Sequence, residues 1–237
     1  MNVQASGVLP PPAPRGVNGM QLPMAMMRDI LIKTIFRMNL DLVSTISRAI
    51  CLPVAVTQEL VDMARSQLLL EATGTLSATS AAEMGYQLTD AGRARALDAL
   101  GQSEYYGPMP VPLNVYREQI ERQSIRNIQI SREQLETAMG HLVLPEDLLS
   151  TLGPAVSAGR SVLLYGPPGN GKSSISNGIR DALGDKIYVP RAIEYSGQVI
   201  TVYDPIVHSA AEDDVDDPNS LRRTSGRFDT RYVRCER

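Results

Sequence analysis

The stretch from 161 to 183 constrains the fold of this 237-residue chain more than any other. It begins with SVLLY at 161–165, an apolar run without alternation that is typical of a strand buried on both faces of a parallel sheet. The segment GPPGNGKS follows directly and fits the pattern GxxxxGK[ST]. Apolar residues then recur at helical spacing, at Ile175, Ile179, Ala182 and Leu183. The sequence therefore predicts a strand, a glycine-rich loop and an amphipathic helix, in that order.

This loop has the composition of a phosphate-binding site. Successive backbone N–H groups can wrap an anion only where side chains do not block the approach, and glycine meets that need. A helix that starts near Lys172 directs its unpaired N–H groups and the positive end of its dipole at the same anion. The alternative is a glycine-rich turn that binds nothing, but the pattern is rare by chance and the flanking strand and helix make an accident rarer still.

We therefore expect the loop to bind ATP with Mg²⁺. Lys172 is the candidate catalytic residue, because its ammonium can neutralise the β and γ phosphates, and the Ser173 hydroxyl is the candidate Mg²⁺ ligand. The residues expected to contact the nucleotide are Gly166, Pro167, Pro168, Gly169, Asn170, Gly171, Lys172, Ser173 and Ser174.

The first hundred residues predict a separate small domain. Residues 1–23 are rich in proline and glycine and are expected to be a disordered or extended lead-in. Helical spacing then predicts a helix from Met24, a second capped by Asp41 and a third over 53–67. Two short strands joined by a small-residue loop follow. Together with a closing helix, they predict a winged-helix domain over 24–101.

The spacing of apolar residues predicts which side chains the helices of this domain bury. The third helix is expected to bury Leu60, Val61, Ala64 and Leu68. The closing helix is expected to be capped by Thr89 or Asp90 and to bury one side made of Ala94, Leu97 and Leu100.

Downstream, residues 102–130 are interpreted as a linker and a connecting helix, and 131–237 as the first part of a second domain. Ser131 with Glu133 resembles a capping box, and Pro145 begins another helical segment. The sequence AIEYSGQVITVY predicts a β-hairpin that turns at Ser196 and Gly197.

The segment LLYGPPGNGKS resembles the Walker A motif of AAA+ ATPases, and YQLTDAGRARA at 86–96 is similar to the wing-to-helix segment of winged helix-turn-helix domains. The whole order resembles bacterial proteins in which a winged-helix segment precedes a MoxR-like ATPase core. Some of these are predicted ATPases with chaperone activity associated with Flp pilus assembly, and 187–208 is also similar to that group.

This resemblance implies an α/β P-loop NTPase fold, here a partial AAA+ core with a parallel sheet, flanking helices and a β-hairpin. It also implies ATP hydrolysis, a homo-oligomeric ring and the remodelling of a protein substrate.

Hydrolysis requires a carboxylate that holds Mg²⁺ at the end of a neighbouring strand. Asp204 in VITVYDP is the candidate, but the hairpin interpretation explains the same run, and in the AAA+ relatives the acidic Walker B motif would come later. We therefore expect this chain to be truncated before Walker B and to bind ATP without turnover. The alternatives are a nucleotide-responsive winged-helix transcriptional regulator and a non-catalytic nucleotide-binding remnant.

Charge and composition bear on partners. A net charge of -3 does not favour binding to a polyanion, and residues 21–100 carry seven basic and eight acidic side chains. The predicted winged helix therefore suits protein contacts better than DNA. The arginine-rich stretch 221–237 is interpreted as a solvated loop followed by an orphaned edge strand.

The cysteines, the histidines and the apolar runs of the sequence bear on metal binding and on location. Two cysteines in unrelated contexts make neither a zinc motif nor a disulfide framework, and His141 and His208 stand isolated from other metal-ligand residue types. Neither a secretory signal nor an apolar run long enough to cross a bilayer is found. We expect a reduced, cytoplasmic protein without membrane insertion.

Overall fold

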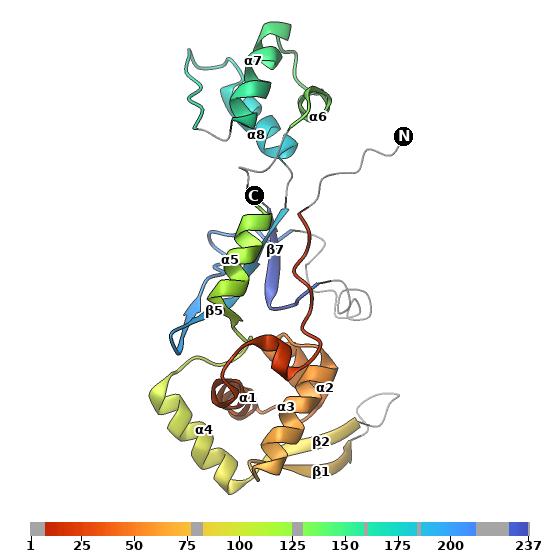
Figure 1. Ribbon diagram of the computed structural model, residues 1–237, viewed down its shortest axis with the longest axis vertical. Coiled ribbons are helices and arrows are strands. Elements are labelled where there is room, and N and C mark those ends of the chain that lie inside the picture. Colours follow the sequence, from red (N-terminus) through yellow and green to blue (C-terminus); the bar gives the residue numbers. More distant parts are fainter. Residues whose placement is uncertain are drawn as a thin grey trace.

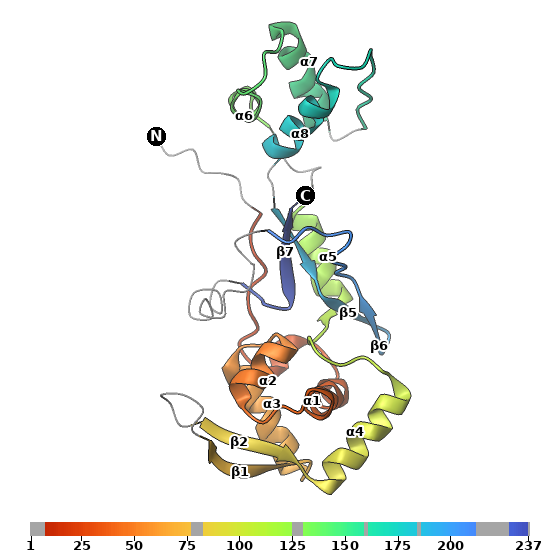
Figure 2. The same ribbon diagram turned by 180° about the vertical axis from the view of Figure 1, so that it is seen from behind.

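The computed structural model describes residues 8–76, 83–124, 130–158, 161–183, 186–211 and 228–236. Helices and small sheets form three groups that follow one another along the long axis of the molecule (Figure 1). The first group contains α1 to α4 and the β1–β2 hairpin. The middle group contains α5 and five short strands. The third group consists of α6, α7 and α8, which the view from behind also shows at one end of the molecule (Figure 2).

The first group packs four helices and a β-hairpin around one apolar core. Its elements are α1 (Met24–Met38), α2 (Val43–Ile50), α3 (Val54–Ser66), β1 (Leu70–Leu76), β2 (Glu83–Leu88) and α4 (Asp90–Gln102). The strands pair antiparallel, with Leu70 opposite Leu88. Apolar residues at helical spacing are buried, among them Met27, Ile30, Leu31, Ile46 and Leu60. The Thr89 cap is confirmed, because its Oγ1 accepts a 3.0 Å hydrogen bond from the Gly92 N–H.

Two local predictions in this group are wrong. Asp41 does not cap α2, whose N-cap is Leu42; instead the Asp41 carbonyl accepts a 2.7 Å hydrogen bond from the Tyr86 N–H and holds β2 beside the start of α2. Leu68 is exposed rather than buried, because the chain turns there with φ at 58° between α3 and β1.

The prediction of which side of α4 is buried is also wrong. The helix buries Gly92, Ala96 and Ala99, while Leu97 is exposed. The buried side of α4 differs from the predicted one for a steric reason. Only glycine fits at position 92, because a Cβ there would lie 2.1 Å from the carbonyl oxygen of Leu69. The small residues of α4 therefore allow its backbone to approach the neighbouring elements closely.

The flanking segments pack on this first group. A 3-10 helix, η1 (Val17–Met20), places Val17, Met20 and Leu22 in the core. After α4, the Lys33 ammonium donates to the Ser103 carbonyl at 2.9 Å, and the Met109 N–H donates to the Ile50 carbonyl at 2.8 Å. Segments on both sides of the predicted domain therefore contribute to its core.

The middle group contains two small sheets beside one helix. Its elements are β3 (Val111–Pro112), α5 (Leu113–Arg122), β4 (Lys186–Pro190), β5 (Ala192–Tyr195), β6 (Gln198–Thr201) and β7 (Tyr232–Glu236). Strand β3 pairs parallel with β5, and β5 pairs antiparallel with β6. The predicted hairpin is confirmed: Tyr195 lies opposite Gln198, with φ at 51° for Ser196 and 81° for Gly197.

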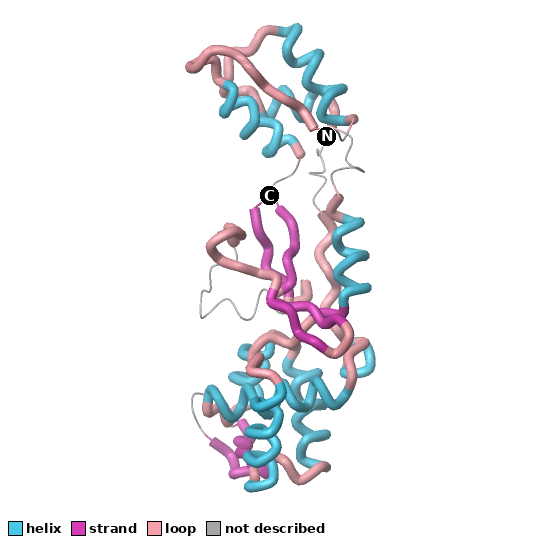
Figure 3. Tube along the Cα trace, turned by 90° about the vertical axis from the view of Figure 1, so that its left-hand side faces the viewer, coloured by secondary structure: helices cyan, strands magenta, loops and turns pink. Residues whose placement is uncertain are grey.

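The prediction of an orphaned edge strand at the C-terminal end is wrong for the residues that are described. Strand β7 pairs antiparallel with β4, from Tyr232 opposite Pro190 to Glu236 opposite Lys186, and Figure 3 shows the two strands side by side. Tyr232, Val233 and Cys235 are buried in this pairing. The Gln123 side chain also contacts β4. Its Nε2 donates to the Tyr188 carbonyl at 3.2 Å, and its Oε1 accepts from the Tyr188 N–H at 3.0 Å.

The third group is a small helical cluster. It consists of α6 (Arg132–Ala138), α7 (Glu146–Ser157) and α8 (Lys172–Ala182), packed around Ile130, Leu135, Met139, Leu152 and Ile175. The capping box at Ser131 is present, but its partner is Gln134 rather than Glu133. The reason is position, because only the side chain at the third helical residue reaches back to the N-cap N–H.

The predicted parallel core is not what the described residues form. Residues 161–165 form neither a helix nor a strand and pair with no described strand, and Leu163 and Tyr165 are exposed. Parallel pairing is limited to β3 and β5, over the pairs Val111 with Ile193 and Pro112 with Glu194. The architecture is mixed α/β with small sheets.

A buried ion pair joins the C-terminal end to the first group. The Arg231 guanidinium donates to both carboxylate oxygens of Asp229, at 2.7–3.0 Å, and to the Pro110 carbonyl at 3.1 Å. Asp229 in turn donates its backbone N–H to the Pro11 carbonyl at 2.8 Å. The Thr230 hydroxyl donates to the Cys51 carbonyl at 2.9 Å. Three consecutive residues therefore hold segments from three distant parts of the sequence.

We predict that Arg231→Ala lowers the free energy of unfolding by about 3–5 kcal/mol, because it leaves the Asp229 carboxylate buried without its partner. Urea unfolding followed by circular dichroism measures the change. Arg132→Ala is the control: its ion pair with Glu136 is exposed and should contribute at most about 0.5 kcal/mol. Equal stability of the two variants would contradict the role of the buried pair.

We also predict that the protein loses stability at alkaline pH through two tyrosines. Burial raises the pKa of Tyr105 and of Tyr232 above the usual value for tyrosine. The folded state therefore keeps both phenols neutral while the unfolded state ionises near pH 10, so stability is full below that pH and falls as the pH rises further.

Matched phenylalanine variants separate the two tyrosines. The Tyr232 hydroxyl is buried and has no hydrogen-bond partner among the described residues, so Tyr232→Phe should be neutral or stabilising at pH 7. The Tyr105 hydroxyl donates to the Pro108 carbonyl at 2.5 Å, so Tyr105→Phe should cost about 1 kcal/mol. Both variants should flatten the fall in melting temperature between pH 9 and 11, and an unchanged profile would argue against buried phenols as its cause.

Candidate phosphate-binding site

The loop before α8 has a backbone that only glycine adopts easily. Gly166, Gly169 and Gly171 have φ of 147°, 87° and 70°, in the region that disfavours side chains. A Cβ at any of these three positions would meet no atom within 4 Å. Backbone conformation, rather than crowding, is therefore what requires glycine in this loop.

The loop ends at the N-terminus of α8. Gly171 is the N-cap and offers no side chain, and the Ile175 N–H makes a 2.9 Å hydrogen bond to the Gly171 carbonyl. The N–H groups of the first helical turn have no partner within the helix and point toward the loop. This is the arrangement that binds anions at helix N-termini.

All residues expected to contact the nucleotide lie together in this loop and first turn. Residues 166–171 and Ser173 are exposed, while Lys172 and Ser174 are half-buried. The Lys172 ammonium donates a 2.6 Å hydrogen bond to the Pro167 carbonyl and so folds back over the loop. The ammonium group therefore lies against the backbone of the loop that would bind an anion.

The helix that carries the loop is fixed by close packing. Ile175 is buried in the helical cluster, and a Cβ on Gly178 would lie 2.7 Å from the Met139 Cγ. Gly178 was not singled out in the sequence, although a glycine within an amphipathic helix is a signal for close approach of a neighbour. It lets α8 lie against the end of α6 and thereby sets the direction of the first turn.

Asp204 lies elsewhere in the fold, in a turn that follows β6. Its carbonyl accepts hydrogen bonds from the N–H groups of Val207 and His208, at 3.1 and 2.8 Å. Its Oδ1 accepts from the Ile206 N–H at 2.8 Å, and its own N–H donates to the His208 Nδ1 at 3.1 Å. The predicted Mg²⁺ carboxylate is therefore an exposed residue of an ordered turn, and no contact to Lys172 is described.

The described residues contain no group of three His, Cys, Asp or Glu side chains placed to hold an ion. The His208 ring lies against Tyr203, with centroids 5.8 Å apart, and serves the turn just described. Among the described helices, none has the length and apolar character needed to cross a membrane.

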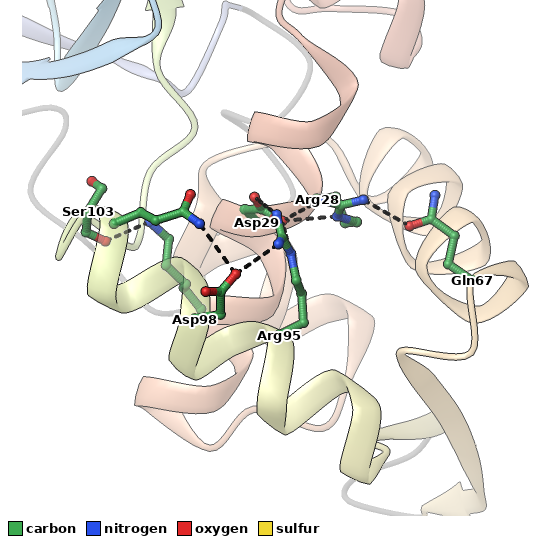
Figure 4. A network of polar contacts seen from close by, with 8 residues as sticks. Arg28, Asp29, Gln67, Arg95, Asp98 and Ser103 are labelled. Carbon is green, nitrogen blue, oxygen red and sulfur yellow. Dashed lines mark hydrogen bonds and ion pairs between the residues drawn. The ribbon is translucent and has the colours of Figure 1, made fainter.

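Several charged side chains of the first group are paired with one another. Asp29 on α1 accepts from Arg95 on α4 at 2.7 Å and from Arg28 at 2.9 Å, and Arg95 also pairs with Asp98 at 2.9 Å (Figure 4). On α3, Arg65 lies 3.5 Å from Asp62. These pairs partly neutralise three of the seven basic side chains of residues 21–100, namely Arg28, Arg65 and Arg95.

No protein-family model matches the chain, and no curated protein or solved structure matches it either. The candidate phosphate-binding site therefore consists of the glycine turns, the start of α8 and Lys172.

We predict that Gly178→Val destabilises the helical cluster by about 1–3 kcal/mol, because the added side chain must displace Met139. Gly153→Ala in α7 is the control, since a Cβ there meets nothing within 4 Å and should stabilise the helix by about 0.5–1 kcal/mol. Urea unfolding measures both. Similar effects from the two substitutions would mean that α6 and α8 are not closely packed.

Proposed function

We propose that this chain binds ATP with Mg²⁺ at residues 166–174, in the manner of a P-loop NTPase. The observation that carries the proposal is the coincidence of three glycines at positive φ with a free helix N-terminus and Lys172 as the first helical residue. The backbone N–H groups bind the phosphates, and Lys172 neutralises the β and γ phosphates. Ser173 supplies a hydroxyl to Mg²⁺.

The resemblance to MoxR-like AAA+ ATPases extends this proposal to the class of protein. In it, the first group is a winged-helix module that docks a protein partner, and the ATP-binding segment belongs to a chaperone-like ATPase that assembles as a homo-oligomer in the cytoplasm. No acidic residue is described in contact with the loop. We therefore propose nucleotide binding without turnover for this chain, which is the non-catalytic alternative.

The transcriptional-regulator alternative receives less support. Asp29 and Asp62 pair with Arg95 and Arg65, so part of the positive charge that DNA phosphates would require is already neutralised. A gel-shift assay with the full chain and duplex DNA tests it, and tight, salt-sensitive binding would favour the regulator.

Lys172→Ala tests the proposed site. We expect it to weaken ATP binding about 10- to 100-fold, the loss typical of a hydrogen-bonded charge, without a change in melting temperature. Calorimetric titration of Mg²⁺ and ATP into the full chain measures the affinity. Lys186→Ala removes the same charge from β4 and should leave the affinity unchanged. Equal affinities of the two variants would remove the assignment of the loop.

A further inference from the structure

Residues 8–14 of the lead-in are held to the middle group by contacts with residues far away in the sequence. They form neither a helix nor a strand, and they lie beside this group on the way to η1 (Figure 2). The Leu9 carbonyl accepts a 3.2 Å hydrogen bond from the Gln119 Nε2 on α5, and the Pro11 carbonyl accepts a 2.8 Å bond from the Asp229 N–H. Two main-chain carbonyls of the lead-in are thus bound, as those of a peptide ligand are.

The surface under the lead-in is largely aromatic. Pro11 is buried, whereas Pro10 and Pro12 are exposed. Val8 belongs to an apolar cluster whose other members are Val111, Val115, Tyr116, Tyr188, Phe228 and Tyr232. Aromatic side chains combined with hydrogen-bond donors are a general means of binding proline-rich extended segments. We call the surface formed by Tyr116, Gln119, Phe228, Asp229 and Tyr232 the lead-in site.

The lead-in leaves two polar atoms of this site unpaired. The Gln119 side chain is only 1% exposed, and its Oε1 has no hydrogen-bond partner among the described residues. Nε2 and Oε1 belong to one planar amide, so Oε1 lies beside the stretch of lead-in that Nε2 binds. The Tyr232 hydroxyl is also buried without a described partner. Because a buried polar atom without a partner costs free energy, the lead-in fits the site incompletely.

Gln123, one helical turn further along α5, shows the complete form of this interaction. Its Nε2 donates to the Tyr188 carbonyl while its Oε1 accepts from the Tyr188 N–H. The lead-in cannot supply a donor in the same way from residues 10–12, because all three are prolines and carry no N–H. Of these three nitrogens, that of Pro11 lies between the two bound carbonyls along the chain.

We propose that the lead-in site is a docking site for an extended, uncharged segment of a partner protein, and that the lead-in is its intramolecular occupant. The partner segment covers the aromatic cluster as the lead-in does, but it has an N–H where the lead-in has Pro11. It therefore pairs both amide atoms of Gln119. The additional hydrogen bond lets it compete with the lead-in, whose advantage is the high effective concentration of a tethered segment.

The site is independent of the proposed ATP site, since none of its residues lies within 166–174. Loss of either proposal leaves the other in place.

Labelled peptides titrated into the full chain test the docking by fluorescence anisotropy. The probes are the peptide of residues 8–16, VLPPPAPRG, and its Pro11→Val and Pro12→Val forms. We expect the Pro11→Val peptide to bind about tenfold more tightly than the other two, because it satisfies the buried Oε1. The Pro12→Val peptide is the matched control, since it gains an N–H at an exposed position. Equal affinities of the two valine peptides would overturn the proposal.

Two variants of the full chain locate the binding. Pro11→Asp should expel the lead-in, because burying a carboxylate is costly, and should strengthen binding of the Pro11→Val peptide at least tenfold. Pro12→Asp places the same charge at an exposed position and should bind as the wild type does. Equal binding by these two folded variants, or no binding by any chain, would overturn the proposal.

Gln119→Met tests the role of the amide. It should abolish the difference between the two valine peptides, and a difference that persists would overturn the assignment of Oε1. Melting temperatures check that each variant folds, and where Pro11→Asp does not fold, the wild type and Gln119→Met decide the outcome. Dimerisation of the wild type that Pro11→Asp abolishes would assign the site to the lead-in of a second copy and overturn docking of a partner.

Discussion

The buried pair of Asp229 and Arg231 is the interaction on which the connection between the first and middle groups depends. The carboxylate and the guanidinium satisfy each other, and the surrounding backbone uses their remaining hydrogen-bonding capacity. A charge buried without such partners would be costly, and the pair is buried where the lead-in, the segment after α4 and the residues before β7 meet. It thereby couples the ends of the described chain to one another.

The helical cluster of α6, α7 and α8 is built differently. It has its own apolar core around Leu135, Met139 and Ile175, and Gly178 permits the close contact that orients α8. In the described chain, the candidate phosphate-binding loop is therefore supported by helices rather than by a parallel sheet. The apolar residues 161–165, which were predicted to form a strand, pair with no described strand.

The functional proposals have different foundations. The proposal of ATP binding depends on local backbone geometry, namely three glycines at positive φ and one helix N-terminus. The proposal of protein remodelling and assembly depends on the resemblance to AAA+ ATPases. The second can fail without removing the first, because the two depend on different residues.

The sequence by itself determined the features that depend on neighbours along the chain. The helix spacing of the first group, the Thr89 cap and the hairpin at Ser196 and Gly197 could be predicted, because local backbone preferences and periodicity decide them. The composition of the candidate site could be predicted for the same reason.

Only the tertiary structure decided which faces meet. Leu97 faces outward because Gly92 lets the α4 backbone approach Leu69 closely. Residues 161–165 have no described strand partner, whereas β7 pairs with β4. Asp204 lies in a turn, and Arg231 donates to the carbonyl of the distant Pro110. These outcomes depend on contacts between residues far apart in the sequence, and neither periodicity nor propensity reports such contacts.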